Sequence, residues 1–149
     1  MNAIDAIRWS MQLTAGGTEN IASTMRESPL VQPTSKGGNH TLWCLGHLAF
    51  VEGSFRQIVF GQPNPVEEWG ALFAPGTTPT TDASDYPSFE EVLSTYLRLR
   101  EENLKMLDEL TDADLDKAPK FIPPGFEEVM QTVGTTLLLL SLHNMVHYG

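Results

Sequence analysis

Two histidines near the end of the chain have the spacing of paired metal ligands. His143 and His147 lie four residues apart in the segment LSLHNMVHYG, which is otherwise largely apolar. Residues four apart on a helix share one face at about 5 to 6 Å, and that separation suits two ligands of one ion. Two histidines satisfied by hydrogen bonds alone would show the same spacing, so the pair by itself leaves both interpretations open.

A third histidine favours the metal site. His47 lies in the middle of another apolar segment, LWCLGHLAFVEG, and a buried imidazole needs a polar partner. If the two segments form facing helices, one ion shared by three neutral imidazoles would satisfy all three rings. We therefore predict one divalent metal ion bound by His47, His143 and His147, with zinc, nickel or iron as the candidates, since imidazole suits each of them.

A metal site of this kind is typical of catalytic rather than structural metal centres. Three neutral imidazoles leave the ion its full charge and leave coordination positions for water or a substrate atom. The ion could lower the pKa of a thiol for transfer to an electrophile, or the pKa of water for hydrolysis. The sequence does not distinguish between these two reactions. Asn144, Tyr148 and Glu52 are candidate neighbours, although Asn144 and Tyr148 each follow a ligand by one residue and point about 100° away.

Other reactive or aromatic side chains are weaker candidates. His40 lies two turns before His47, about 10 Å along a helix axis, which is too far to share the ion. We expect it to be exposed or to line the mouth of the site, where it could carry protons. Cys44 could border the site, but we expect a buried, inert thiol. Three tryptophans could line a substrate cleft, although core or dimer-interface positions are more common: Trp9, Trp43 and Trp69.

Four segments show the apolar periodicity of helices. The first runs from Ile4 to Met25, and the second runs from a cap at Asn39 to about Phe60, where Gly61 ends it. The third follows a capping box of Ser88 and Glu91, and a shorter helical turn follows at 112–117. The fourth, from about 132 to the end, is apolar nearly all round, as expected of a helix packed on several sides.

The segment 61–87 separates the second and third helices. It holds five of the ten prolines and no sustained periodicity. We expect an ordered loop packed over the helices by Trp69, Leu72 and Phe73, acting either as a lid or only as a crossover. The sequence thus predicts an all-α fold, a four-helix bundle with a long crossover loop between helices 2 and 3, in one domain spanning residues 1–149.

Composition and charge exclude several classes of partner. Nine basic against nineteen acidic residues give a net charge of −10, which repels the phosphates of nucleic acid and the anionic surface of a membrane. The single cysteine cannot form an internal disulfide. We expect no signal peptide, and we find no apolar run of the roughly 20 residues that span a bilayer. We expect a soluble, cytoplasmic protein that binds neither nucleic acid nor membrane.

Four motifs resemble those of the DinB/YfiT-like superfamily, whose members are regarded as metalloenzymes. They are NHTLWCLGHLAFVEG, the W-x-x-L-F-x-x-G run at 69–76, DYPSFEEV, and TVGTTLLLLSLHNMVHYG. The similarity extends over nearly the whole chain, and its sharpest elements are the G-H-L around His47 and the H-x-x-x-H-x-G at the end. It implies a four-helix bundle that holds a divalent ion with His47, His143 and His147.

The resemblance also implies a range of activities. Characterised relatives include S-transferases and isomerases that depend on low-molecular-weight thiols, and many members have no known reaction. We therefore expect a small-molecule substrate, such as a low-molecular-weight thiol, and a homodimer. The alternative is a non-enzymatic metal-binding protein of the stress response, in which the ion ties the second helix to the fourth. Members usually continue beyond the H-x-G, whereas this chain stops at Gly149, so we expect His147 to lie in a last turn that can fray.

Overall fold

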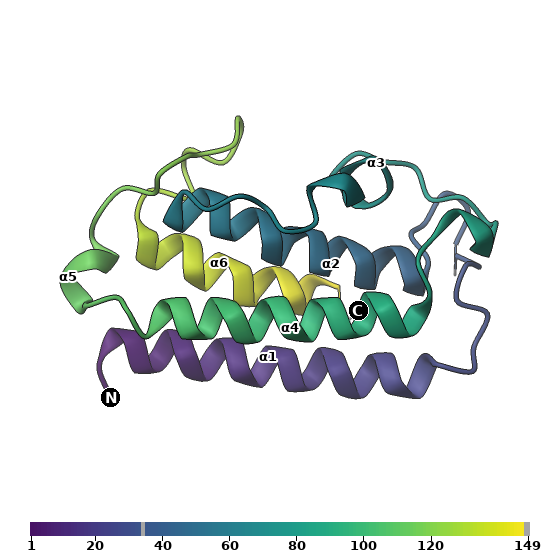
Figure 1. Cartoon of the computed structure of the whole chain (residues 1–149), viewed down its shortest axis with the longest axis horizontal. Helices are drawn as coiled ribbons and strands as arrows, with labels where there is room; N and C mark the ends of the chain where they lie inside the picture. The colour runs from purple at the N-terminus through teal and green to yellow at the C-terminus, as the bar shows by residue number, and fades with distance from the viewer. Residues whose placement is uncertain (34, 148–149) are drawn as a thin grey trace.

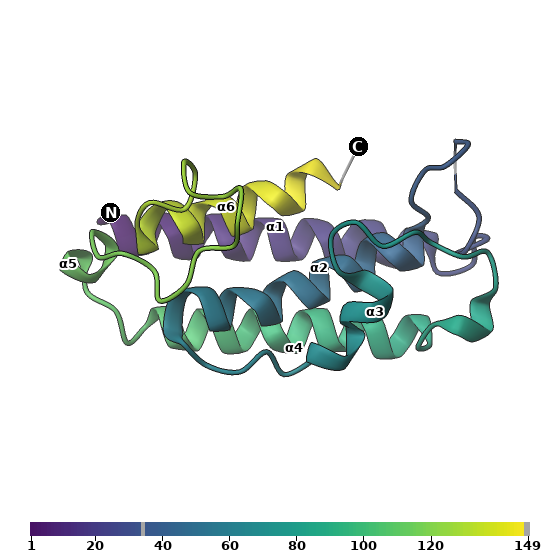
Figure 2. The ribbon, with the colours of Figure 1, turned by 90° about the horizontal axis from the view of Figure 1, so that it is seen from above.

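The computed structural model describes residues 1–33 and 35–147, and within these ranges the chain is helical and contains no strand. Its four longest helices are α1 (Ala3–Met25), α2 (Thr41–Phe55), α4 (Phe89–Leu107) and α6 (Val133–Val146). They lie side by side along the long axis of the molecule (Figures 1 and 2). At 14 residues, α6 is the shortest of the four, and it ends partway along that axis. The prediction of an all-α fold is confirmed.

Local side-chain contacts determine where the helices begin. Asn2 and Asp5 form a reciprocal capping box at the start of α1, and the Ser88 hydroxyl accepts from the backbone N–H of Glu91 at the start of α4. Each contact satisfies a donor that has no partner within the first helical turn. The expected cap of α2 at Asn39 is wrong by one residue, because His40 occupies the N-cap position and its Nδ1 accepts from the backbone N–H of Trp43 at 3.0 Å.

The second helix continues beyond α2 in a different geometry. Residues Arg56–Phe60 form a turn of π-helix, and Gly61 follows with a positive φ of 68°. Its N–H bonds back to the carbonyl of Gln57, which closes the helix end as a left-handed glycine commonly does. The predicted end near Phe60 is therefore confirmed, while the widened last turn is a feature that apolar periodicity does not reveal.

Two apolar clusters hold the helices together. One cluster joins α2 to α4 and to the crossover, and the other joins α1 and α6 to the end of the second helix. Six apolar side chains of the second helix are buried: Leu42, Leu45, Leu48, Ala49, Phe55 and Val59. Burying such side chains contributes roughly 1.5 to 3 kcal/mol each.

The expectation that the last helix is packed on several sides is wrong for one of its faces. Leu142 is 61% exposed and Val146 is 74% exposed, and Leu138 and Met145 are also exposed. The helix contacts α1, α2 and α5, but no described element covers this outer face. The apolar residues of this segment predicted a buried helix. Periodicity, however, cannot identify which neighbouring element covers each face.

The crossover between α2 and α4 is ordered and packs on the helices. It contains two 3-10 turns, Glu67–Trp69 and Ala83–Asp85, and the short helix α3 (Gly70–Phe73). Trp69 and Phe73 are buried against α2, as predicted for this segment. After α4, the short α5 (Asp112–Leu115) leads into the segment before α6. Among the described residues, no helix is long and apolar enough to cross a membrane.

Candidate metal centre

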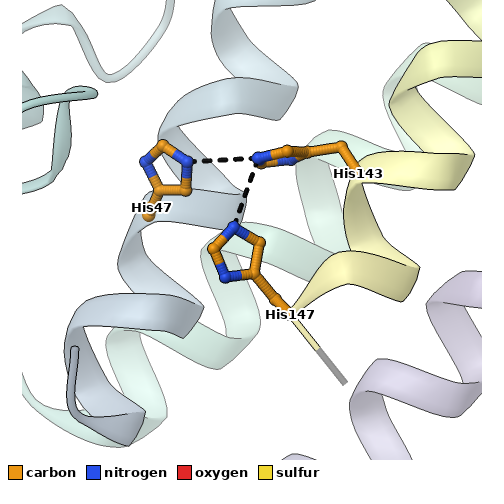
Figure 3. A group of neighbouring side chains, drawn as sticks. All are labelled: His47, His143 and His147. Carbon is orange, nitrogen blue, oxygen red and sulfur yellow. Dashed lines mark hydrogen bonds between the residues drawn. The ribbon is translucent and has the colours of Figure 1, made fainter. Parts of the chain in front are cut away.

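Three histidine rings meet between α2 and α6. His47 lies in the middle of α2, while His143 occupies the last turn of α6 and His147 its C-cap. The Nε2 atom of His143 lies 3.2 Å from the Nε2 of His47 and 3.2 Å from the Nε2 of His147, and Figure 3 shows all three rings pointing toward one another. The structure thus brings together all three predicted ligands, hereafter the triad.

The backbone of the crossover orients the His47 ring. Its Nδ1 lies 2.7 Å from the carbonyl oxygen of Phe73. Because a carbonyl only accepts, Nδ1 carries the proton and Nε2 presents a lone pair to the other two rings. A histidine that binds a metal through Nε2 has this tautomer, and such a hydrogen bond also fixes the ring orientation.

Gly46 allows the crossover to come close enough for this contact. A Cβ atom at Gly46 would lie 2.2 Å from the Phe73 ring, well inside van der Waals contact. Phe73 itself is fully buried, so its ring has little room to move aside. The glycine of the G-H-L motif therefore has a packing role that directly supports the neighbouring histidine.

Trp43 holds the other side of the His47 ring. The two rings are stacked with centroids 4.8 Å apart and planes 7° from parallel. The indole N–H donates to the carbonyl of Leu72 and to the Thr77 hydroxyl, at 2.9 and 3.0 Å. Trp43 consequently fixes the crossover and the imidazole together, and its role is to position His47.

The three Nε2 atoms cannot all be satisfied by hydrogen bonds to one another. Each neutral imidazole nitrogen carries either a proton or an in-plane lone pair. His143 Nε2 has a ring nitrogen 3.2 Å away on both sides, so it can donate to one neighbour or accept from one, but cannot do both. The other contact is then left without a directed hydrogen bond, and because three nitrogens share only two states, at least one of the three possible pairs faces lone pair to lone pair or proton to proton. A cation at the meeting point would accept all three lone pairs.

Burial favours the neutral form of every ring in the triad. Together with the neighbouring His147 and His47 rings, it lowers the pKa of His143 to about 4. Burial also lowers the pKa of His147, an effect increased by His47, and that of His47, where the Phe73 carbonyl opposes it. The rings are therefore neutral near pH 7, which is the form that binds metal ions.

Two of the three nitrogen–nitrogen separations match those around a small divalent ion. Zinc–nitrogen bonds of about 2.0 to 2.1 Å at tetrahedral angles place neighbouring ligand nitrogens about 3.3 Å apart, and the two measured separations are 3.2 Å. The three ligand atoms all lie within 4.8 Å of one another. In addition, Nδ1 of His143 is buried with no hydrogen-bond partner among the described residues, so this ring is held less firmly than His47.

A second buried polar group lies deeper between α2 and α4. The Glu52 carboxylate accepts from Arg100 Nε at 2.9 Å and from Asn103 Nδ2 at 2.8 Å, and it also pairs with Arg100 Nη2. Arg100 further donates to the Met11 carbonyl on α1 at 3.1 Å. Burial raises the pKa of Glu52, an effect opposed by Arg100 and Asn103. We call Glu52, Arg100 and Asn103 the ion-pair cluster.

The predicted neighbours of the ligands belong mostly to the core. Glu52 is part of the ion-pair cluster rather than of the metal centre. Asn144 is fully buried, and its Oδ1 accepts from Tyr96 at 2.7 Å and from Thr18 at 3.1 Å. It therefore ties α6 to α4 and α1, directly beside His143 in the sequence. Tyr148 lies outside the described residues.

The remaining candidates have structural positions. Of the two positions expected for His40, the exposed one is wrong, because the residue is buried and both ring nitrogens contact the backbone, Nε2 lying 2.9 Å from the Thr80 carbonyl. It lines a cavity of about 240 Å³ that Cys44 and His147 also border. Burial raises the pKa of the Cys44 thiol. Of the tryptophans, Trp43 and Trp69 lie in the core and Trp9 is exposed.

The sequence reasoning missed several residues that support the site. The Phe73 carbonyl carries no side-chain signal, so only the structure identifies it. Arg100 and Asn103 did leave a signal. They lie on one α4 stripe, at spacings of four, three and four residues, between two buried residues, Tyr96 and Leu107. A polar residue at a core position of a helix is informative, because burial requires a partner.

The sequence of the chain matches a known protein family. The sequence model of the DinB superfamily matches residues 12–149, a range that includes all three histidines. A search of curated proteins found no match.

Proposed function

Because this chain belongs to the DinB superfamily and three of its histidines converge, we propose that it is a metal-dependent enzyme with an open three-histidine site. His47, His143 and His147 are the ligands of one divalent ion. The observation that carries the proposal is the meeting of three Nε2 atoms that hydrogen bonds alone cannot satisfy. The fold assigned to it is a four-helix bundle with a long crossover, forming a single domain over residues 1–149.

The residues around the triad suit an ion with reactive positions. Bound to three neutral imidazoles, a divalent ion supplies a Lewis acid that lowers the pKa of a thiol or of water. Phe73 and Trp43 hold His47 in its binding orientation. The cavity beside His47 and His143 is lined mainly by apolar side chains, which lower the local dielectric constant and strengthen electrostatic effects at the site. The reaction we assign is S-transfer from a low-molecular-weight thiol, or a related hydrolysis.

The rival is a non-enzymatic metal-binding protein of the stress response, in which the ion only ties α2 to α6. A structural ion has its coordination closed by protein atoms, usually four. Among the described residues, the group that could hold an ion contains three side chains. That number favours an open position and therefore the enzyme.

The test begins with metal content. The protein is purified without a nickel column, and elemental analysis is expected to find one divalent ion per chain. His147→Ala should lose the ion, whereas His40→Asn, a matched control that keeps a helix-capping side chain, should retain it. A wild-type protein that binds no ion, or a His147→Ala variant that binds it as tightly, would overturn the proposal.

Activity is tested on the metal-loaded protein. Cellular thiols are combined with a panel of electrophiles and thiol consumption is followed, while a panel of esters and amides reports hydrolysis. Turnover that disappears in His147→Ala and remains in His40→Asn supports the enzyme. Absence of thiol consumption with every pair overturns the transferase, and absence of turnover in both panels favours the non-enzymatic rival.

We further propose a homodimer that forms in the cytoplasm. The dimer is supported by exposed apolar side chains on two neighbouring helices, α1 and α6: Trp9, Leu13, Leu138, Leu142, Met145 and Val146. Exposed apolar groups in such number commonly mark an interface. Light scattering should give twice the chain mass for the wild type and the monomer mass for Leu13→Lys; a monomeric wild type contradicts the dimer. The cytoplasm is supported by the lone cysteine, which cannot form an internal disulfide.

A further inference from the structure

An apolar cavity of about 260 Å³ adjoins the triad on the side of His47 and His143. Its walls come from four parts of the chain that are distant in sequence. α2 contributes Val51 and Phe55, α6 contributes Leu139, and the segment before α6 contributes Phe126 and Met130. The crossover contributes Pro75. The cavity therefore exists only in the folded protein, and both of its histidines belong to the proposed metal centre.

The chemistry of the walls restricts what the cavity can bind. None of the described residues that line it carries a charge. Ser54 contributes a hydroxyl, but its Oγ already donates to the Phe50 carbonyl at 3.0 Å and accepts from Asn64 Nδ2 at 3.2 Å. The two histidines are thus the polar groups left for a ligand. A charged or strongly hydrated group elsewhere in the cavity would lose its water without gaining a partner.

The segment before α6 forms the outer wall. It is attached to the end of the second helix by a hydrogen bond of 2.8 Å from the Lys120 N–H to the Ile58 carbonyl, and Met130 is buried against the core. Phe126 lines the cavity although it is 41% exposed, so it borders both the cavity and solvent. This wall can be altered with little effect on the core.

The size of the cavity sets the size of its ligand. An engineered protein cavity of about 150 Å³ holds one benzene molecule, so 260 Å³ accommodates roughly ten carbon atoms by the same ratio. We propose that this cavity binds the uncharged apolar part of the substrate, an alkyl chain or an aromatic ring system, with its polar end at His47 and His143. The inference rests on the proposed function only for that polar end, which the ion would bind.

The apolar part is tested first on metal-free protein, so that the result does not depend on the ion. The probes are straight-chain alcohols from butanol to decanol, and the readout is the NMR signal of the Met130 methyl group. Met25 provides the internal control, because it lines the other cavity. The dissociation constant should fall by about fourfold for each added methylene until the cavity is full. No dependence on chain length, or shifts at Met25 instead of Met130, would overturn the inference.

Two variants of the outer wall give a matched comparison. Phe126→Ala removes part of the wall and should weaken octanol binding by roughly fivefold or more. Phe121→Ala is the control, because Phe121 lies in the same segment and is 50% exposed but is not among the residues that line the cavity. Its octanol affinity should equal that of the wild type. Equal losses in both variants would contradict the assignment of the wall.

The polar end is tested with straight-chain carboxylates from acetate to decanoate and zinc-loaded protein. Zinc should lower the dissociation constant of every carboxylate. Each added methylene should lower it further, by the same factor as for the alcohols. If zinc tightens acetate binding but chain length adds nothing, this inference fails and the proposed function stands. If chain length adds its factor but zinc has no effect, the apolar cavity stands and the proposed function fails.

Discussion

Two groups of buried polar side chains, the triad and the ion-pair cluster, connect α2 to another helix by opposite means. In the cluster, a carboxylate meets a guanidinium and an amide, so donors face acceptors. The exception is the side-chain amide oxygen of Asn103, Oδ1, which has no hydrogen-bond partner among the described residues. In the triad, three chemically identical rings face one another, and no arrangement of their protons satisfies every contact.

The difference separates a structural polar group from a functional one. A buried group that is satisfied by its own chain has no need of a ligand, and removing one partner leaves the other buried and unpaired. A buried group whose members cannot satisfy one another has a place for an added atom. The two groups should therefore respond differently to mutation, metal and pH, and four predictions follow that comparison from the largest effect to the smallest.

The largest effect is expected in the ion-pair cluster. Arg100→Met leaves the Glu52 carboxylate buried without its cation, which should lower the free energy of unfolding by about 3 to 5 kcal/mol. Lys105→Met is the control on the same helix, because Lys105 pairs with Glu101 on the surface and should matter by less than about 0.5 kcal/mol. Urea denaturation measures both. Equal values for the two variants would remove the distinction between the cluster and an ordinary surface ion pair.

The triad should depend on metal instead. Zinc at 100 to 1,000 times its dissociation constant should raise the free energy of unfolding by about 2.7 to 4.1 kcal/mol. In His147→Ala that increase should vanish, while the metal-free variant should stay within about 1 kcal/mol of the metal-free wild type, because it loses a contact that was not fully satisfied. Thermal unfolding with and without a chelator tests this. A large loss of stability in the metal-free variant would assign the triad a structural role.

Gly46→Ala should affect the triad through its support. The added methyl would collide with the Phe73 ring, and displacing that ring should cost about 1 to 3 kcal/mol of stability. Because Phe73 also holds His47 through its carbonyl, metal affinity should fall by about 10- to 100-fold. Gly16→Ala is the control, since nothing lies within 4 Å of a Cβ at Gly16. Metal titration should find wild-type affinity there. Unchanged affinity in Gly46→Ala would show that the carbonyl contact is dispensable.

The smallest effect concerns pH. Burial lowers the pKa of the triad histidines below the value of about 6.5 that they have when unfolded. Below that pH the unfolded chain binds more protons than the folded one, so the stability of the metal-free protein should decrease as pH falls from 6.5 toward the pKa of His143, about 4. His143→Leu should reduce this slope. Identical pH profiles of melting temperature in the two proteins would contradict the assignment.

Much of the fold could be predicted because its signals are local. The apolar spacing from Ile4 to Met25, the Ser88 cap and Gly61 each act within a few residues, and each predicted a helix or its end close to where the structure has it. His40 shows the limit. As a histidine it was a candidate proton carrier, but it lies one residue before α2 and serves as the N-cap of that helix. The outer face of α6 shows another limit, since Leu142 and Val146 are apolar yet exposed.

The candidate site divides in the same way. The types of His47, His143 and His147, and the four-residue spacing of the last two, are properties of the sequence, and they were sufficient to select the three rings. That His47 meets His143 at 3.2 Å, that the Phe73 carbonyl sets the His47 tautomer, and that an apolar cavity lies beside them depended on the packing of distant segments. Periodicity acts over one helical turn, whereas these contacts join residues 26 to 96 positions apart, and only the tertiary structure decides which of those come together.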